Sequence, residues 1–260
     1  MKTCELHSIR SYEGWRAHRV EVIETARGLV IVKGQRIARG ELWRKVFDWI
    51  ARDFNLPMLQ VPVRDGGRLA QDVEVRRLGE LIEAGLAVPR VIHVEDEFFV
   101  REFLEGDELA RLLEQQTPDA ATLWEQGLRT IQAFHRRGQY FSQAFARNFI
   151  VTARGIVAID FEEDPLDVMS LPEAQARDWL LYLQSTVWLL PKGDVCAMQA
   201  WREIIGAEDA FQAGLLRQLA LRVGWLRHLP HKRKPWGRDL ISTQAAAAFL
   251  YDWATAGQPI

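Results

Sequence analysis

The chain has 260 residues, of which 48% are hydrophobic and 26% are charged, and its formal net charge is −2. These proportions are typical of a folded globular protein and exclude an intrinsically disordered chain. The near-neutral charge also argues against a general nucleic-acid-binding protein, whose surface carries a large excess of lysine and arginine.

The N-terminal third of the sequence is rich in predicted strands. Residues 17–33 hold two β-branched runs separated by a turn signal, and this pattern predicts a hairpin. Apolar residues at helical spacing then predict helices over residues 41–53 and 70–85, with Gly85 as the stop of the second. Residues 88–104 hold two further apolar runs and predict a second pair of strands.

The remainder of the sequence is mainly helical in character. Residues 107–137 predict helices, and residues 149–151 and 156–159 predict two short strands joined by a turn. The C-terminal sequence predicts further helices, with interruptions at two segments that contain proline and glycine, residues 191–193 and 230–237.

This change of character near residues 104–107 predicts an α+β, bilobal architecture. A small strand-rich lobe is expected over residues 1–105, and a larger helical lobe over residues 106–260. No internal repeat and no low-complexity linker interrupts either part.

Four polar residues occur in an order that points to phosphate chemistry. Lys33 closes a predicted strand, and Glu74 lies on the helix that follows. Asn148 precedes one short strand, and Asp160 follows the next, in the segment IVAIDFEED. A triphosphate needs a cation on its phosphates, and a neighbouring carboxylate can fix the lysine rotamer. Asparagine and aspartate supply the hard oxygen ligands that Mg²⁺ prefers.

This order resembles the protein-kinase-like superfamily, in which a strand lysine holds the phosphates and pairs with a helix glutamate. The resemblance implies a kinase-like fold that binds ATP and Mg²⁺ between the two lobes. Lys33 would then hold the phosphates and Glu74 would orient it. Asn148 and Asp160 would be the metal ligands, and Lys33 and Asp160 would count among the catalytic residues.

A finer resemblance links the chain to bacterial small-molecule and lipopolysaccharide core kinases. Residues 74–92, EVRRLGELIEAGLAVPRVI, are similar to their glutamate-led helix and the strand after it. Residues 98–109, FFVREFLEGDEL, look like their hinge, which implies that Glu102 and the backbone of Phe103 and Leu104 lie near the adenine. Asp178 matches a helix aspartate that braces the catalytic loop in these kinases.

The catalytic loop departs from the pattern of that family. In FHRRGQYFSQAFARNFIV, Gln143 stands five residues before Asn148, where the catalytic aspartate belongs, and Phe141 replaces the usual histidine. A glutamine cannot accept a proton at neutral pH and therefore cannot act as a general base. The Gly-x-Gly-x-x-Gly loop that covers the phosphates is also absent. Asp164 or Glu162 could replace the missing base if the loop folds back.

Three readings of function remain open at this point. The first is an ATP- and Mg²⁺-dependent phosphotransferase similar to lipopolysaccharide core kinases, with an envelope saccharide or lipid as acceptor. The second is a pseudokinase, a nucleotide- or partner-binding module without turnover, which Gln143 and the missing glycine-rich loop favour. The third is an unrelated helical adaptor, in which Lys33 and Asp160 lie far apart as ordinary solvated charges.

The cellular location is predicted from what the sequence lacks. Cys4 and Cys196 are its only cysteines, which suits a reducing compartment. It has neither a signal peptide nor an apolar run of about 18 residues, so a cytoplasmic protein without a transmembrane segment is expected. The basic residues within 227–238, including HKRKPWGR, are either a solvated face or a peripheral contact with an anionic glycolipid at the inner membrane.

Overall fold

The computed structural model describes most of the chain beyond residue 65 and parts of the first 35 residues. The described residues are 6, 9–11, 14–26, 28–35, 60, 66–191, 193–229 and 233–256, except for the side chains of 233–236. The helix predicted over residues 41–53 lies outside the described residues.

An antiparallel four-stranded sheet occupies the N-terminal end of the molecule. Its strands are β1 (Val20–Thr25), β2 (Gly28–Gly34), β3 (Val91–Val94) and β4 (Phe98–Glu102), in the order β1-β2-β4-β3. The first two strands form the predicted hairpin, and the last two form the predicted second pair.

The two faces of this sheet have different partners because side chains alternate along each strand. Val32 and Val100 are buried on one face, in a cluster with Trp15 of the short helix α2 (Gly14–His18). The opposite face carries Lys33 and Phe99, which lie directly across from each other on β2 and β4. A lysine is therefore held on the inner face of the sheet.

Helix α4 (Gly67–Glu83) is the helix predicted over residues 70–85. Its residues Leu78 and Leu81 are fully buried in the main core, together with Phe99 of the sheet. The helix ends shortly before Gly85, whose φ of 70° lies in the left-handed region that glycine adopts without a steric cost.

A second, smaller sheet lies between the N-terminal sheet and the helices. It consists of β5 (Gly106–Glu108), β6 (Phe149–Thr152) and β7 (Gly155–Ala158), in that order. Strands β6 and β7 were predicted, whereas β5 was not, because three exposed residues carry no alternating pattern. They become a strand through their pairing with the edge of β6.

The C-terminal part is a helical assembly around buried aromatic rings. Its α-helices are α5 (Leu109–Glu114), α6 (Ala120–His135), α7 (Leu171–Thr186), α8 (Val195–Gly206), α9 (Ala210–Arg222) and α10 (Arg233–Thr255). Its 3₁₀ turns are η2 (Ala146–Asn148), η3 (Pro165–Asp167), η4 (Val187–Leu189) and η5 (Gly224–His228). The rings of Trp179 and Trp253 each meet Trp201 edge to face at 5.6 Å. The interruption expected over residues 230–237 is partly replaced by helix, because α10 begins at Arg233 and a proline is tolerated in a first helical turn. Gly237 still departs from helical geometry, with a φ of 82°.

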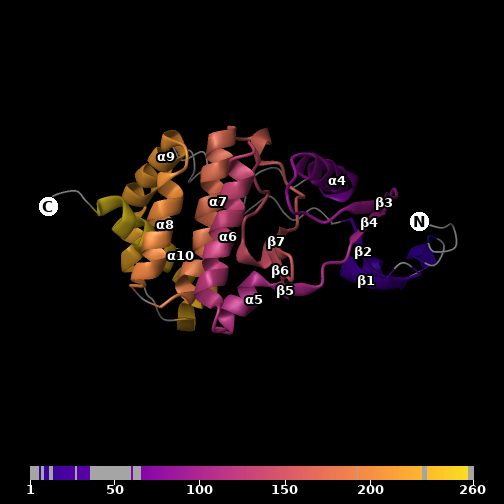
Figure 1. Cartoon of the computed structure of the whole chain (residues 1–260), viewed down its shortest axis with the longest axis horizontal. Helices are drawn as coiled ribbons and strands as arrows, with labels where there is room; N and C mark the ends of the chain where they lie inside the picture. The colour runs from indigo at the N-terminus through magenta and orange to yellow at the C-terminus, as the bar shows by residue number, and fades with distance from the viewer. Residues whose placement is uncertain are drawn as a thin grey trace.

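Figure 1 shows the resulting arrangement, with the N-terminal sheet and α4 at one end of the long axis and helices α6 to α10 towards the other. The predicted α+β class, with a strand-rich N-terminal part and a helical C-terminal part, is confirmed and is consistent with a kinase-like fold. Residues 103–105 connect the two sheets. Among the described residues, no helix is long and apolar enough to cross a membrane.

Candidate functional site

Lys33 is the centre of the candidate site. Its ammonium lies 2.8 Å and 2.7 Å from the two carboxylate oxygens of Glu74, which α4 presents to the inner face of the sheet. Both side chains are buried, with 7% of Lys33 and 2% of Glu74 exposed. The two residues are 41 positions apart in sequence. The fold therefore builds a buried ion pair between a strand and a helix that are far apart in sequence.

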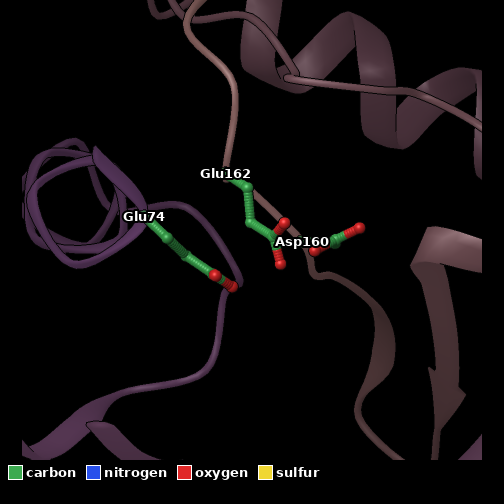
Figure 2. A group of neighbouring side chains, drawn as sticks. All are labelled: Glu74, Asp160 and Glu162. Atoms are coloured by element: carbon green, nitrogen blue, oxygen red, sulfur yellow. The ribbon is translucent and has the colours of Figure 1, made fainter. Parts of the chain in front are cut away.

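Two further carboxylates reach the same ammonium from the segment after β7. Asp160 Oδ1 lies 2.7 Å from Lys33 Nζ, and Glu162 Oε1 lies 2.6 Å from it. Figure 2 shows Glu74 extending from its helix towards the carboxylates of Asp160 and Glu162. Asp160 has a φ of 71°, a left-handed conformation in which aspartate is enriched. Arg19 also pairs with Glu162.

The cluster is rich in carboxylates. Lys33 and Arg19 carry two positive charges, against three negative charges on Glu74, Asp160 and Glu162. One oxygen from each of the three carboxylates lies within 4.8 Å of the others. Such a set of hard oxygen donors suits Mg²⁺. Asp160 is the most accessible of the three, with 34% of its side chain exposed, whereas Glu162 is 9% exposed.

Asn148, the other predicted metal ligand, is a buried residue at the end of η2. Its Nδ2 donates to the backbone oxygen of Gln143 at 2.9 Å, which leaves the amide oxygen as the atom suited to a metal ion. Its backbone oxygen accepts from Ile159 N at 2.9 Å, so the loop is fixed beside the residue that precedes Asp160.

Gln143 is engaged with an acidic residue that sequence reasoning did not single out. Its Nε2 donates to Glu163 Oε1 at 2.7 Å, while Arg147 Nη2 lies 3.4 Å from its Oε1. The Ser142 hydroxyl donates to the backbone oxygen of Glu163. The loop at Gln143 is therefore joined to the acidic segment through two hydrogen bonds to one residue.

The two carboxylates named as possible replacement bases are both held by other partners in this structure. Asp164 accepts hydrogen bonds from Tyr140 Oη at 2.6 Å and Arg76 Nη2 at 2.7 Å. Burial alone would raise the pKa of Asp164, but these bonds outweigh it and the pKa is lowered. Glu162 is held by Lys33 and by Arg19. Gln143 bonds Glu163 instead.

Helix α4 is also tied to Asp164 and to the loop at Tyr140 through its arginines. Arg76 bonds Asp164, as described above, and Arg77 Nη2 donates to the backbone oxygen of Tyr140 at 3.0 Å. The Arg77 guanidinium lies over the Tyr140 ring, 4.0 Å from its centroid. Since Glu74 is on the same helix, any shift of α4 would disturb both the lysine pair and this loop.

Asp178 lies where a brace for the loop was expected. Its Oδ2 accepts from Phe141 N at 3.0 Å and contacts His135 Nε2 at 3.1 Å. The other ring nitrogen of His135 lies 3.2 Å from Glu208 Oε2. Burial opposes protonation of His135, but its bonds to the two carboxylates outweigh burial and raise its pKa. Burial also raises the pKa of Asp178.

The residues predicted to lie near the adenine of ATP are outside the pocket beside Lys33. That pocket is lined by Arg19, Lys33, Gly34, Gln35, Gly67, Ala70, Gln71, Glu74, Phe99 and Glu162. Glu102, Phe103 and Leu104 are not among its lining residues and are partly exposed. The Glu102 side chain accepts from Arg90 Nε at 3.3 Å.

The predicted basic stretch is described only at its two ends. Arg227 lies over the ring of Tyr251 at 3.8 Å, and Arg238 lies over the ring of Trp188 at 4.8 Å. Arg238 also pairs with Glu114. Side chains 230–236 lie outside the described residues, so membrane contact through this stretch stays a prediction.

The chain matches a known protein family. The model of the RIO domain, an atypical protein-kinase-like family, matches residues 24–163, which is more than half of the chain and includes Lys33, Glu74, Asn148 and Asp160. No curated protein matches the chain. The expected membership of the kinase-like superfamily is thus confirmed, whereas the finer resemblance to lipopolysaccharide kinases gains no support from the match.

Proposed function

The chain belongs to the RIO domain family of kinase-like proteins, and on that premise we propose that it is a phosphotransferase. It binds ATP with Mg²⁺ between the N-terminal sheet and the segment after β7, and it transfers the terminal phosphoryl group to an acceptor hydroxyl. Residues 1–105 act as the nucleotide-binding lobe, and residues 106–260 carry the catalytic and metal-binding loops.

One observation carries this proposal, the meeting of Lys33, Glu74 and Asp160 at distances of 2.7–2.8 Å. Three elements far apart in sequence supply these residues, namely β2, α4 and the segment after β7. Burying a cation and its carboxylate partners gives little stability on balance, because desolvation offsets most of the attraction. A cluster of this kind is therefore more readily explained by function than by stability.

The protein's own residues have distinct roles in the proposed reaction. Lys33 binds phosphate oxygens, and Glu74 holds the Lys33 side chain in the orientation that reaches them. Asp160 and the amide oxygen of Asn148 are the proposed metal ligands, with Glu162 as a third candidate. Bound Mg²⁺ supplies the charge that neutralises the phosphate oxygens during transfer. Because Glu162 now pairs with Lys33, a triphosphate must displace its carboxylate from the ammonium.

The absence of an aspartate at position 143 does not by itself forbid transfer. Phosphoryl transfer proceeds through a loose transition state, so positioning and charge stabilisation matter more than removal of the acceptor's proton. Gln143 donates its amide hydrogen to Glu163, and its carbonyl oxygen, which already accepts a long contact of 3.4 Å from Arg147 Nη2, has a second lone pair that can accept a hydrogen bond from the acceptor hydroxyl. In this role Gln143 orients the acceptor but takes no proton.

A pseudokinase is the second candidate, and Gln143 is the observation that favours it. Such a protein would bind the nucleotide at the same site and regulate a partner without turnover.

If the protein is an active phosphotransferase, the proposal extends to the class of its acceptor. We infer an envelope saccharide or lipid from the sequence similarity of residues 74–92 to lipopolysaccharide core kinases.

Turnover by the wild type and by Gln143→Asp separates the two candidates. Release of nucleoside diphosphate and phosphate transfer are measured with Mg²⁺-ATP and a panel of envelope saccharides and lipids. The substitution places a carboxylate where an acceptor hydroxyl would lie, and general-base assistance is typically worth about 10²–10⁴-fold in rate. A rise of that order in Gln143→Asp would show intact transfer geometry that lacks only a base.

The control for this experiment is Gln218→Asp, the same substitution on the exposed surface of α9. It is expected to leave turnover at the wild-type level. Turnover by the wild type supports the phosphotransferase. Nucleotide binding without turnover in wild type and Gln143→Asp alike, over the whole panel, would contradict it and favour the pseudokinase.

A further inference from the structure

Arg19 lies beside Lys33 at the candidate site. It follows α2 and precedes β1, and its backbone oxygen accepts from Gly34 N at 2.6 Å. Because Gly34 comes directly after Lys33 on β2, this bond holds the Arg19 backbone next to the strand end that carries the lysine. The Arg19 side chain lines the pocket beside Lys33, and 28% of it is exposed. A second cation therefore faces the pocket from outside β2.

Arg19 and Lys33 converge on a single carboxylate oxygen. Glu162 Oε1 lies 2.6 Å from Lys33 Nζ, and the same oxygen pairs with Arg19 Nη2. Carboxylate and phosphate oxygens accept the same charge-assisted hydrogen bonds from arginine and lysine. Glu162 thus marks an anion position between two cations, and only 9% of its side chain is exposed there.

The backbone of Arg19 has a conformation that does not favour an arginine. Its φ is 69°, in the left-handed region that glycine adopts without a steric cost and that other residues adopt uncommonly. Such outliers persist where the surrounding structure holds them, and they cluster at functional sites. The chain therefore places a long cationic side chain at a backbone position that would suit glycine, at the edge of the candidate site.

The chain also lacks the glycine-rich loop that covers the phosphates in kinases with that motif. The Gly-x-Gly-x-x-Gly pattern is absent from the sequence, and Gly14 is the only glycine before Gly28. A triphosphate bound at Lys33 would then need other donors on this side of the pocket. Arg19 supplies a guanidinium there.

We propose that Arg19 and Lys33 together bind the β- or γ-phosphate of the nucleotide, and that this phosphate replaces the Glu162 carboxylate between them. The inference rests on the proposed nucleotide-binding function. Asp160, which also contacts Lys33, is a proposed ligand of Mg²⁺, and in kinases this ion bridges the β- and γ-oxygens. That relation places both cations at the same end of the triphosphate. The displaced Glu162 carboxylate then becomes available to the metal ion.

Calorimetric titration of the full chain with Mg²⁺-ATP and with AMP tests the proposal. A hydrogen bond between charged groups is worth about tenfold or more in affinity, so Arg19→Gln should bind Mg²⁺-ATP at least about tenfold more weakly than the wild type. AMP lacks the β- and γ-phosphates, so its affinity should not change. Arg19→Lys retains a cation and should bind Mg²⁺-ATP more tightly than Arg19→Gln.

Arg16→Gln is the matched control, because Arg16 is exposed on α2 and pairs with Glu97. It should retain the wild-type affinity. Arg19→Gly is a second variant without the charge, and its backbone is suited to the position, since glycine adopts a φ of 69° without a steric cost. It should show the same loss of Mg²⁺-ATP affinity, and it carries the test if Arg19→Gln fails to fold.

The results separate this inference from the proposed function. Wild-type affinity for Mg²⁺-ATP in a folded Arg19→Gln or Arg19→Gly would overturn the inference and leave the proposed nucleotide site intact. An equal loss for ATP and AMP, or an equal loss of Mg²⁺-ATP affinity in Arg19→Lys and Arg19→Gln, would overturn it as well, because the pocket rather than a phosphate contact would have changed. If the folded wild type does not bind Mg²⁺-ATP, the proposed function itself fails.

Discussion

Replacing Lys33 by methionine tests whether the carboxylate cluster depends on one buried cation. Methionine has a similar length and no charge, so the change removes the ammonium and leaves the packing of the stem largely intact. Glu74 is then left with 2% of its side chain exposed and without its charge partner. Asp160 retains access to water, and Glu162 retains Arg19, so both tolerate the loss better.

The expected loss of stability follows from the charge that remains. Removing one partner of a buried ion pair typically costs about 3–5 kcal/mol, because the other partner stays buried and uncompensated. The three carboxylates still repel one another after the change, so nothing offsets the loss of the cation. We therefore expect Lys33→Met to lower the free energy of unfolding by about 3 kcal/mol. Adding Glu74→Leu removes the stranded charge and should recover about 2 kcal/mol of that loss.

Urea denaturation of the wild type, both single variants and the double variant gives the coupling energy directly. Arg129→Ala is the control, because it breaks an exposed ion pair on α6 and should cost less than about 0.5 kcal/mol. A loss below about 1 kcal/mol in Lys33→Met, or a coupling energy near zero, would refute the view that Lys33 and Glu74 form a buried pair.

Three further substitutions test the packing and the loop brace. Gly127→Ala places a methyl group against the hydroxyl of Tyr182 and should destabilise the protein by about 1–3 kcal/mol, whereas Gly79→Ala, with open space around it, should stabilise it by about 0.5–1 kcal/mol. Equal effects of the two changes in denaturation would contradict this packing. His135 has a raised pKa in the folded state, so its protonation stabilises the fold below its ordinary pKa of about 6.5, and this stability is lost as pH rises through the folded value. Its partner Asp178 also has a raised pKa, which acts in the same direction. His135→Gln should flatten this decline in a urea series from pH 6 to 9, and a wild type that gains stability over that range would contradict the assignment.

Local patterns in the sequence were enough to predict the elements that frame the site. The hairpin that ends near Lys33 and the helix that carries Glu74 have periodic apolar residues, and both lie where predicted. The short strand β5 was missed because its three residues depend on pairing with β6 rather than on their own pattern.

The composition of the site was predicted only in part. Lys33, Glu74 and Asp160 meet as expected from their order, because their contexts at strand ends and on a helix fix where their side chains start. The approach of Arg19 and Glu162 was not predictable, since a run of acidic residues does not reveal which one turns inward. The hydrogen bond between Gln143 and Glu163 was not predictable either, because it joins two loops whose residues are 20 positions apart in sequence. The roles assigned to these residues in binding and catalysis stay predictions.

Calorimetric titration of Mg²⁺-ATP and Mg²⁺-GTP into the wild type and Asp160→Ala tests the central claim most directly. Removal of the Asp160 carboxylate takes away a proposed oxygen ligand of the metal, so the phosphates are poorly neutralised and binding should be lost. Asp239→Ala, a charge-matched change on the exposed surface of α10, should bind as the wild type does. We predict Mg²⁺-dependent nucleotide binding by the wild type and by Asp239→Ala, and none detectable by Asp160→Ala. Undiminished affinity in a folded Asp160→Ala, or no binding of either nucleotide by the wild type, would contradict the proposed site.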